Sequence, residues 1–135
     1  MVKFGIIGCG NISKFHFNAI EKAGGKVTYI ADINPQNAEK WIEKTGAEFT
    51  TDYKELIKSD NVDVVSVLAS AKFHKEMVMC ALDAGKHIVC EKTMANNAEE
   101  AYEIASAALK SKKLFFTTYM KRFFQIGRAS CRERV

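Results

Sequence analysis

The sequence is poor in residues that stabilise small domains through covalent bonds or metal ions. Proline occurs once in 135 residues, and the four cysteines are scattered, with no CxxC pair and no histidine at ligand spacing. This pattern argues against a disulfide framework and against zinc, so no metal site is expected. The cysteines are predicted to act as small hydrophobic residues. They are Cys9, Cys80, Cys90 and Cys131.

The sequence also lacks a strong excess of one charge and any long apolar run. The formal net charge is +4, and the last eleven residues carry +2 of it, from three arginines and one glutamate. The remainder is nearly balanced, which argues against a surface for nucleic acid or anionic membranes. No apolar run is long enough for a signal peptide or a membrane span, so a cytoplasmic protein with no membrane partner is expected.

What the sequence does contain is a series of short apolar runs that alternate with segments of helical period. The runs are KFGIIG, KVTYIAD, VDVVSVLA, KHIVC and LFFTTY. Continuous apolarity is typical of strands covered on both faces, and the alternation indicates βαβ units around a parallel sheet. We therefore predict a single α/β domain of the Rossmann type, with a doubly wound parallel sheet.

Four segments have apolar residues at helical spacing: 12–23, 34–46, 72–85 and 97–113. In the first, the predicted buried face comprises Ile12, Phe15, Ala19, Ile20 and Ala23. Trp41 in the second segment is expected in the core. Asn97 begins the fourth and precedes Glu100 by three residues, which is typical of a capping box.

The first strand ends in a glycine loop, and the first helix follows it. Gly8 and Gly10 allow a tight turn and a close approach of the backbone to a pyrophosphate. Amides near Asn11 and Ile12, at the helix start, present partial positive charge to it. Ser13 stands where the motif usually has a third glycine, which serves close packing of helix on strand. By itself, the loop fits a structural turn as well as a dinucleotide site.

An acidic residue in the right place decides between these readings. Asp32 ends the second strand, 24 positions after Gly8, where a carboxylate can accept hydrogen bonds from both hydroxyls of the adenosine ribose. No arginine follows it in ADINPQ, so a 2′-phosphate would meet an uncompensated anion. The pattern predicts a dinucleotide site that takes NAD in preference to NADP. A methyltransferase that binds S-adenosylmethionine also has a glycine loop and an acidic second strand, and is an alternative.

Two later stretches extend the pattern. VDVVSVLASAKFH leads from a strand to Ala69, Ser70 and His74, and AGKHIVCEKTMANNAEEA places Glu91 and Lys92 just past the next strand. Both loops are expected at the carboxyl edge of the sheet, where open α/β folds bind ligands. With GIIGCGNISKFH, they resemble the amino-terminal domain of the Gfo/Idh/MocA oxidoreductases, typified by glucose-fructose oxidoreductase and inositol dehydrogenase. The stretch GKHIVCEK argues against the methyltransferase alternative.

The resemblance, which covers Val2 to Phe124, implies an NAD(P)-dependent oxidoreductase. Such an enzyme would transfer a hydride between a nicotinamide and a small-molecule sugar, cyclitol or related polyhydroxy substrate. The family has a Glu-Lys-Pro motif whose lysine lies beside the nicotinamide, and Lys92 matches it, so Lys92 is the predicted catalytic residue. Thr93 stands in place of that proline, and Ala69-Ser70-Ala71 replaces a Thr-Pro-Asn loop. These departures favour a second hypothesis, a catalytically silent NAD-binding module.

The glycine motif and the resemblance together predict the cofactor contacts. His74 is expected either to contact the cofactor or substrate side of its loop or to cap the following helix. Tyr119 and Arg122 match positions on the nicotinamide side of the cleft, and Arg122 could instead anchor a second domain. The predicted cofactor-binding residues are Gly8, Gly10, Asn11, Ile12, Asp32, Ala69, Ser70, His74, Glu91, Lys92 and Arg122.

The family continues into a second α/β domain that carries substrate contacts and the oligomer interface. Here QIGRASCRERV follows instead, and it looks like a translated sequencing adapter; a genuine basic tail is the alternative. We expect residues 1–124 to form the NAD(P)-binding domain, 125–135 to be a non-native tail, and the second domain to be absent. The full-length protein is expected to form a homo-oligomer through that domain, and this chain to bind cofactor without turning over substrate.

Overall fold

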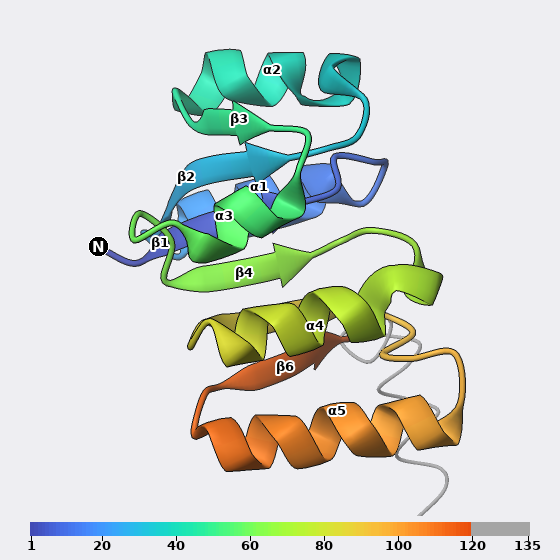
Figure 1. The fold of residues 1–135 in the computed structure, drawn as a ribbon. Coiled ribbons are helices and arrows are strands. Elements are labelled where there is room, and N and C mark those ends of the chain that lie inside the picture. Colours follow the sequence, from blue (N-terminus) through green and yellow to red (C-terminus); the bar gives the residue numbers. More distant parts are fainter. Residues whose placement is uncertain (120–135) are drawn as a thin grey trace, which may run out of the picture.

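The computed structural model describes residues 1–119, which form a six-stranded, all-parallel sheet with helices on both faces (Figure 1). The strands are β1 (Lys3–Ile7), β2 (Lys26–Ala31), β3 (Glu48–Thr50), β4 (Val64–Val67), β5 (His87–Glu91) and β6 (Phe115–Thr118). Their order, β3-β2-β1-β4-β5-β6, reverses direction between β1 and β4. This is the Rossmann order, and it confirms the predicted fold class.

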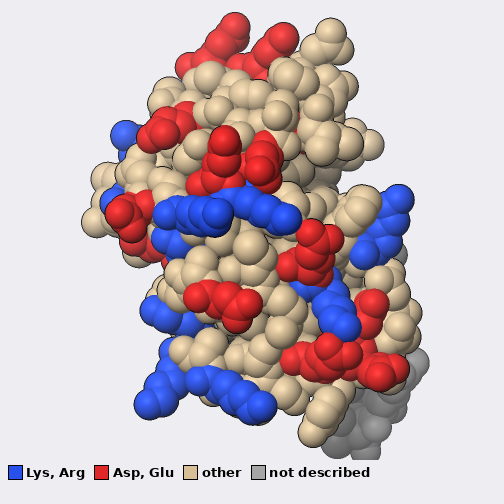
Figure 2. Space-filling model, viewed as in Figure 1, with Lys and Arg blue, Asp and Glu red and all other residues tan. Residues whose placement is uncertain are grey.

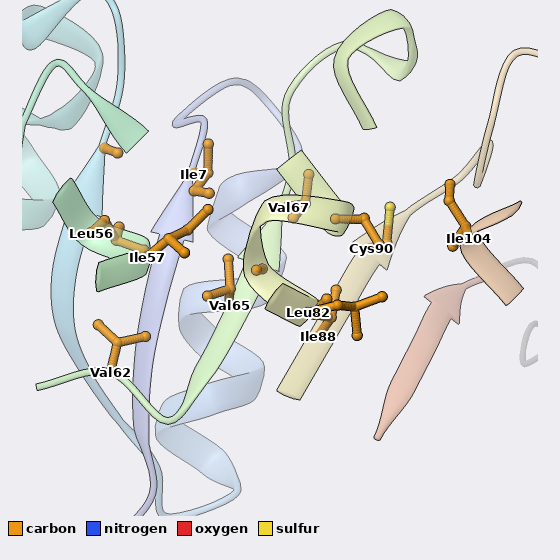
Figure 3. Close-up of a cluster of buried hydrophobic side chains, with 13 residues drawn as sticks. Ile7, Leu56, Ile57, Val62, Val65, Val67, Leu82, Ile88, Cys90 and Ile104 are labelled. Carbon is orange, nitrogen blue, oxygen red and sulfur yellow. The ribbon is translucent and has the colours of Figure 1, made fainter. Parts of the chain in front are cut away.

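The helices divide between the two faces of the sheet. They are α1 (Ser13–Lys22), α2 (Pro35–Thr45), α3 (Tyr53–Lys58), α4 (His74–Asp83) and α5 (Ala98–Ser111), with a 3-10 turn η1 (Ala71–Phe73) before α4. Residues of α1 and α2 share one buried cluster, and residues of α3, α4 and α5 share the other. Figure 3 shows the second cluster, in which Ile57 and Leu82 lie against strand residues such as Val65. The sheet is therefore covered on both faces, as the apolar runs predict.

Local chemistry explains where the predicted helices start and end. The Asn34 side chain accepts a bond from the Gln36 amide at the start of α2, and Gly46 ends that helix at a φ of 67°. Asn97 caps α5 by accepting from the Glu100 amide, as predicted. The Glu100 carboxylate, however, accepts from Asn96 in this structure.

The face of α1 was only partly predicted. Ile20 is buried as expected, but Phe15 is 49% exposed, and Phe17 is buried in its place and stacks on Trp41 with ring centroids 4.0 Å apart. Phe15 instead borders an apolar depression between α1 and the sheet, which Val89 and Thr118 also line. The prediction failed because α1 presents apolar side chains both to the core and to this depression.

Two short elements, β3 and α3, have no counterpart in the sequence prediction. Three and six residues are too few for a hydrophobic period to be detected. The carboxylate of Asp52 caps α3 by accepting from the Lys54 amide.

The face of the molecule that carries α3, α4 and α5 shows a mixture of both charges (Figure 2). Figure 2 shows Lys and Arg interspersed with Asp and Glu over the face formed by α3, α4 and α5. Within residues 1–119, none of the helices has the length and apolarity that crossing a membrane requires.

Candidate functional site

The candidate site lies at the carboxyl edge of the sheet, where the connections from β1 and β4 diverge to opposite faces. The Leu68 amide donates to the Ile7 carbonyl at 2.8 Å and so brings the two loops together. Gly8 has a φ of +96°, and a Cβ there would lie 3.0 Å from the Ala69 nitrogen. Only glycine fits this position without strain, because the conformation and the close approach both exclude a side chain.

Gly10 has a different environment. It is exposed, and a Cβ on it would meet no described atom within 4 Å. The open space lies at the start of α1, where the amides around Asn11 and Ile12 give the helix its partial positive charge. This open space at the positive end of a helix, called the cradle below, leaves room for a pyrophosphate.

Ser13 takes the third small position of the loop and is almost fully buried, at 1% exposure. Its hydroxyl donates to the Gly10 carbonyl at 2.7 Å, and its amide donates to the same carbonyl at 3.0 Å. The polar group is thus satisfied inside the loop, and the small side chain preserves the close approach of α1 to the sheet.

We expect Ser13→Val to destabilise the fold by about 1–3 kcal/mol, because a larger side chain overpacks this position and leaves the Gly10 carbonyl without the hydroxyl. Ser13→Gly is expected to cost less than about 1 kcal/mol, since glycine fits the same space. Urea denaturation of both variants measures the difference. Equal stability of the valine variant and the parent would show that the position is not sterically restricted.

Asp32 fastens the end of β2 to the glycine loop. It is 9% exposed, and its Oδ2 accepts from the Cys9 amide at 2.7 Å. Its Oδ1 accepts from the Asn34 amide at 2.8 Å and from the Asn37 side chain at 3.2 Å. A carboxylate offers about four acceptor positions, so one remains for a ligand, and displacing the exposed Asn37 amide frees another.

The cysteine beside Asp32 is chemically quiet. Burial, followed by the nearby Asp32 charge, raises the pKa of the Cys9 thiol to about 12. Burial similarly raises the pKa of Cys90 to about 12. Both thiols stay protonated at neutral pH, in agreement with the prediction that they act as small hydrophobic residues.

Ile33 is a feature of this edge that sequence reasoning missed. It follows Asp32 directly and is 91% exposed, which is unusual for a large aliphatic side chain. Its position immediately after Asp32, the acidic residue that follows β2, was the signal in the sequence that could have identified it as a site residue.

The carboxylate of Glu91, at the end of β5, bonds to the protein. Glu91 is 6% exposed; its Oε1 contacts His16 Nε2 at 3.0 Å and accepts from the Thr118 hydroxyl, while its Oε2 accepts from the Lys92 amide at 3.1 Å. Burial alone would raise the pKa of Glu91, but these hydrogen bonds outweigh it and hold the pKa below its usual value. Lys92 itself is exposed, and the peptide bond between Lys92 and Thr93 is cis.

His74 is fully buried and joins two loops of the site. Its Nδ1 lies 2.7 Å from the Thr93 carbonyl, and its Nε2 lies 2.9 Å from the Ala69 carbonyl. Both contacts are outside α4, and α4 has no side-chain cap bond, so the expectation that His74 caps this helix is wrong. Contact between His74 and a cofactor stays a prediction.

The structure brings most of the predicted residues to one edge of the sheet. The loop after β1, Asp32 after β2, Ala69 and Ser70 after β4, and Glu91 and Lys92 at β5 all follow the carboxyl ends of parallel strands. Arg122 and the predicted tail, 125–135, lie outside the described residues.

Comparison with known proteins supports this geometry. The family model GFO_IDH_MocA, described as "Oxidoreductase family, NAD-binding Rossmann fold", matches residues 2–119. The inositol 2-dehydrogenase/D-chiro-inositol 3-dehydrogenase of Halalkalibacterium halodurans is 33% identical over 127 residues, which cover 90% of this chain and 36% of that protein. The chain thus spans about a third of the length of this curated relative.

Two solved structures of dehydrogenases are also similar to this chain. The WlbA dehydrogenase from Bordetella pertussis, solved with NADH and UDP-GlcNAcA, has a TM-score of 0.84 and 28% identity, covering 90% of this chain and 36% of that one. The myo-inositol 2-dehydrogenase from Lactobacillus plantarum has a TM-score of 0.86 and 25% identity, covering 97% of this chain and 40% of that one. With the Rossmann strand order and the glycine loop at its switch point, the family match over residues 2–119 shows that this chain belongs to the Gfo/Idh/MocA oxidoreductase family and forms its NAD-binding Rossmann fold.

Proposed function

We propose that this chain is the cofactor-binding part of an NAD-dependent dehydrogenase that acts on a sugar, a cyclitol or a related polyhydroxy compound. The observation that carries the proposal is the open cradle at Gly10, set at the switch point beside the buried carboxylate of Asp32. The substrate class is supported by the relatives, one an inositol dehydrogenase and another solved with NADH and UDP-GlcNAcA.

Different residues of the chain would bind different parts of the cofactor. Amides of Gly10, Asn11 and Ile12 bind the pyrophosphate at the start of α1. The free acceptor position of Asp32 takes a ribose hydroxyl, and the exposed side chain of Ile33 offers an apolar surface to the adenine ring.

Lys92 would manage the proton at the reacting end. When bound, the nicotinamide supplies or accepts the hydride. Loss of a hydride from a carbinol carbon also requires loss of the hydroxyl proton, and Lys92, which lies exposed just past the end of β5, would accept that proton as the neutral amine. Ala69 and Ser70, in the loop after β4, would border the same end of the cofactor.

The charges around Asp32 support NAD over NADP. The four residues after it are Ile33, Asn34, Pro35 and Gln36, and none is positively charged. A 2′-phosphate would meet the Asp32 carboxylate without a counter-charge.

We also propose that residues 1–124 are the NAD(P)-binding domain and that 125–135 are a non-native tail. Substrate contacts and a homo-oligomer interface would then belong to the part of the family's fold that this chain does not span, so the chain would bind cofactor without turnover.

Calorimetric titration of the chain with NADH and with NADPH tests the proposal. Saturable binding of NADH with a one-to-one stoichiometry is expected, with NADPH weaker by about a hundredfold, since juxtaposing two anions costs several kcal/mol. S-adenosylmethionine should not compete. Absence of saturable NADH binding to a folded chain would contradict the assignment.

A further inference from the structure

The turn that carries Lys92 is attached to the rest of the protein at both of its ends. Lys92 is exposed and extends from a backbone segment whose two neighbours, Glu91 and Thr93, each contact a histidine. These histidines come from different helices, His16 from α1 and His74 from α4. The two histidines therefore constrain the backbone on either side of Lys92.

The attachment through Glu91 joins three elements. The Glu91 carboxylate at the end of β5 contacts His16 on α1 at 3.0 Å and accepts from Thr118 at the end of β6. The side chains of His16 and Glu91 are only 11% and 8% exposed, so solvent screens their interaction far less than that of a surface pair. The same carboxylate accepts from the Lys92 amide at 3.1 Å, which carries the constraint directly to the backbone of the lysine.

The attachment through Thr93 joins the loop after β4 to the loop after β5. The His74 ring has its Nδ1 2.7 Å from the Thr93 carbonyl and its Nε2 2.9 Å from the Ala69 carbonyl. A ring with a proton on each nitrogen donates to both carbonyls, whereas a neutral ring donates to one. Because Ala69 packs against Gly8, the ring also fixes the Lys92 turn relative to the glycine loop.

The two histidines act from opposite faces of the sheet. His16 belongs to α1, which shares a buried cluster with α2, and His74 belongs to α4, which packs in the cluster of α3 and α5. The Lys92 turn is thereby held between the faces, while the helix that supplies His16 is the one whose first turn forms the pyrophosphate cradle. These contacts connect the start of α1 to the backbone on both sides of Lys92.

We propose that His16 and His74 are positioning residues for Lys92, His16 through the Glu91 carboxylate and His74 through the Thr93 carbonyl, and that they align the lysine with the nicotinamide end of the cofactor. The inference rests on the proposed cofactor site and deepens it. It also gives Glu91, a predicted cofactor contact, a different role as the link between α1 and the Lys92 turn.

The test compares ligands that share the pyrophosphate and adenosine but differ at the nicotinamide. Calorimetry of the full chain gives the dissociation constants of NADH and of ADP-ribose, and mass spectrometry gives the rate at which acetic anhydride acetylates Lys92 with and without each ligand. In the parent chain, NADH should slow acetylation of Lys92 and ADP-ribose should not.

His16→Leu removes the donor to Glu91, and His16→Gln keeps an N–H donor on a side chain of similar reach. We expect His16→Leu to weaken NADH binding by about tenfold and to abolish NADH protection of Lys92, while ADP-ribose affinity stays within about twofold. His16→Gln should restore most of both effects. His74→Leu, which removes both ring nitrogens that contact the Thr93 and Ala69 carbonyls, should show the same selective loss of NADH affinity and of Lys92 protection in the folded variant.

Glu21→Gln is the matched control, because it breaks the exposed 2.8 Å pair between Glu21 and Lys44 in the last turns of α1 and α2, at the opposite ends of these helices from the site. It should leave both affinities and the protection unchanged. Equal weakening of NADH and ADP-ribose in folded His16→Leu, or intact protection of Lys92, would overturn the positioning role. Binding of neither ligand by the folded parent chain would overturn the proposed function itself.

Discussion

Gly10→Ala is expected to weaken NADH binding by roughly a hundredfold while leaving the free energy of unfolding within about 0.5 kcal/mol of the parent. A Cβ at residue 10 meets no described atom within 4 Å, so the fold accommodates it. The methyl group would occupy the space proposed for the pyrophosphate and disrupt charge-assisted bonds from the helix start, each worth about 1.5–3 kcal/mol. Calorimetry and urea denaturation of the same preparation measure both quantities.

Gly8→Ala is the control from the same loop, and its main effect should be a loss of stability. Residue 8 has a φ of +96°, and its new Cβ would press on the Ala69 nitrogen at 3.0 Å. This variant should lose about 1–3 kcal/mol of stability, because both the backbone conformation and the close approach are strained. If Gly10→Ala binds NADH as tightly as the parent, the cradle does not hold the pyrophosphate.

The contrast between these glycines shows what the sequence could predict. The motif identified both as loop glycines, because tight turns and close backbone approaches restrict residue type locally. Helix caps such as Asn97 were predicted for the same reason: the capping bond joins residues three positions apart. The structure then showed that a side chain at residue 8 would be strained and that the space beside Gly10 is open, a distinction that depends on the position of Ala69.

The partners of Glu91 and His74 could not be predicted from the sequence. His16 and Glu91 are 75 positions apart, and His74 and Thr93 are 19 apart, so no local pattern relates them. They meet only because the strand order places β5 between β4 and β6 and because α1 brings His16 to within 3.0 Å of the Glu91 carboxylate at the end of β5. The short elements β3 and α3 escaped detection for another reason, since their few residues contain no measurable period.

Asp32→Ala is expected to change the cofactor preference of the chain as well as its affinity. The substitution removes the acceptor proposed for the ribose, so NADH should bind about a hundredfold more weakly. It also leaves the amides of Cys9 and Asn34 without their acceptor, which should cost about 2–4 kcal/mol of stability. Loss of NADH affinity alone would therefore not separate a ribose contact from a damaged loop.

The ratio of NADH to NADPH affinity makes that separation. Damage to the glycine loop weakens both cofactors alike, whereas removal of the carboxylate relieves its repulsion of a 2′-phosphate and favours NADPH alone. Ile33→Arg provides an independent comparison, because residue 33 is 91% exposed and can change without disturbing the core. The arginine should strengthen NADPH binding by about tenfold, as expected for a new charge-assisted bond to the phosphate.

The double variant, Asp32→Ala with Ile33→Arg, should therefore bind NADPH more tightly than NADH, the reverse of the parent. Calorimetric titration of the parent, both single variants and the double variant with both cofactors gives the four ratios. An unchanged ratio in Asp32→Ala would mean that the carboxylate only holds the loop, and the preference for NAD would need another cause. A shifted ratio in both single variants would place the adenosine ribose between residues 32 and 33, at the end of β2.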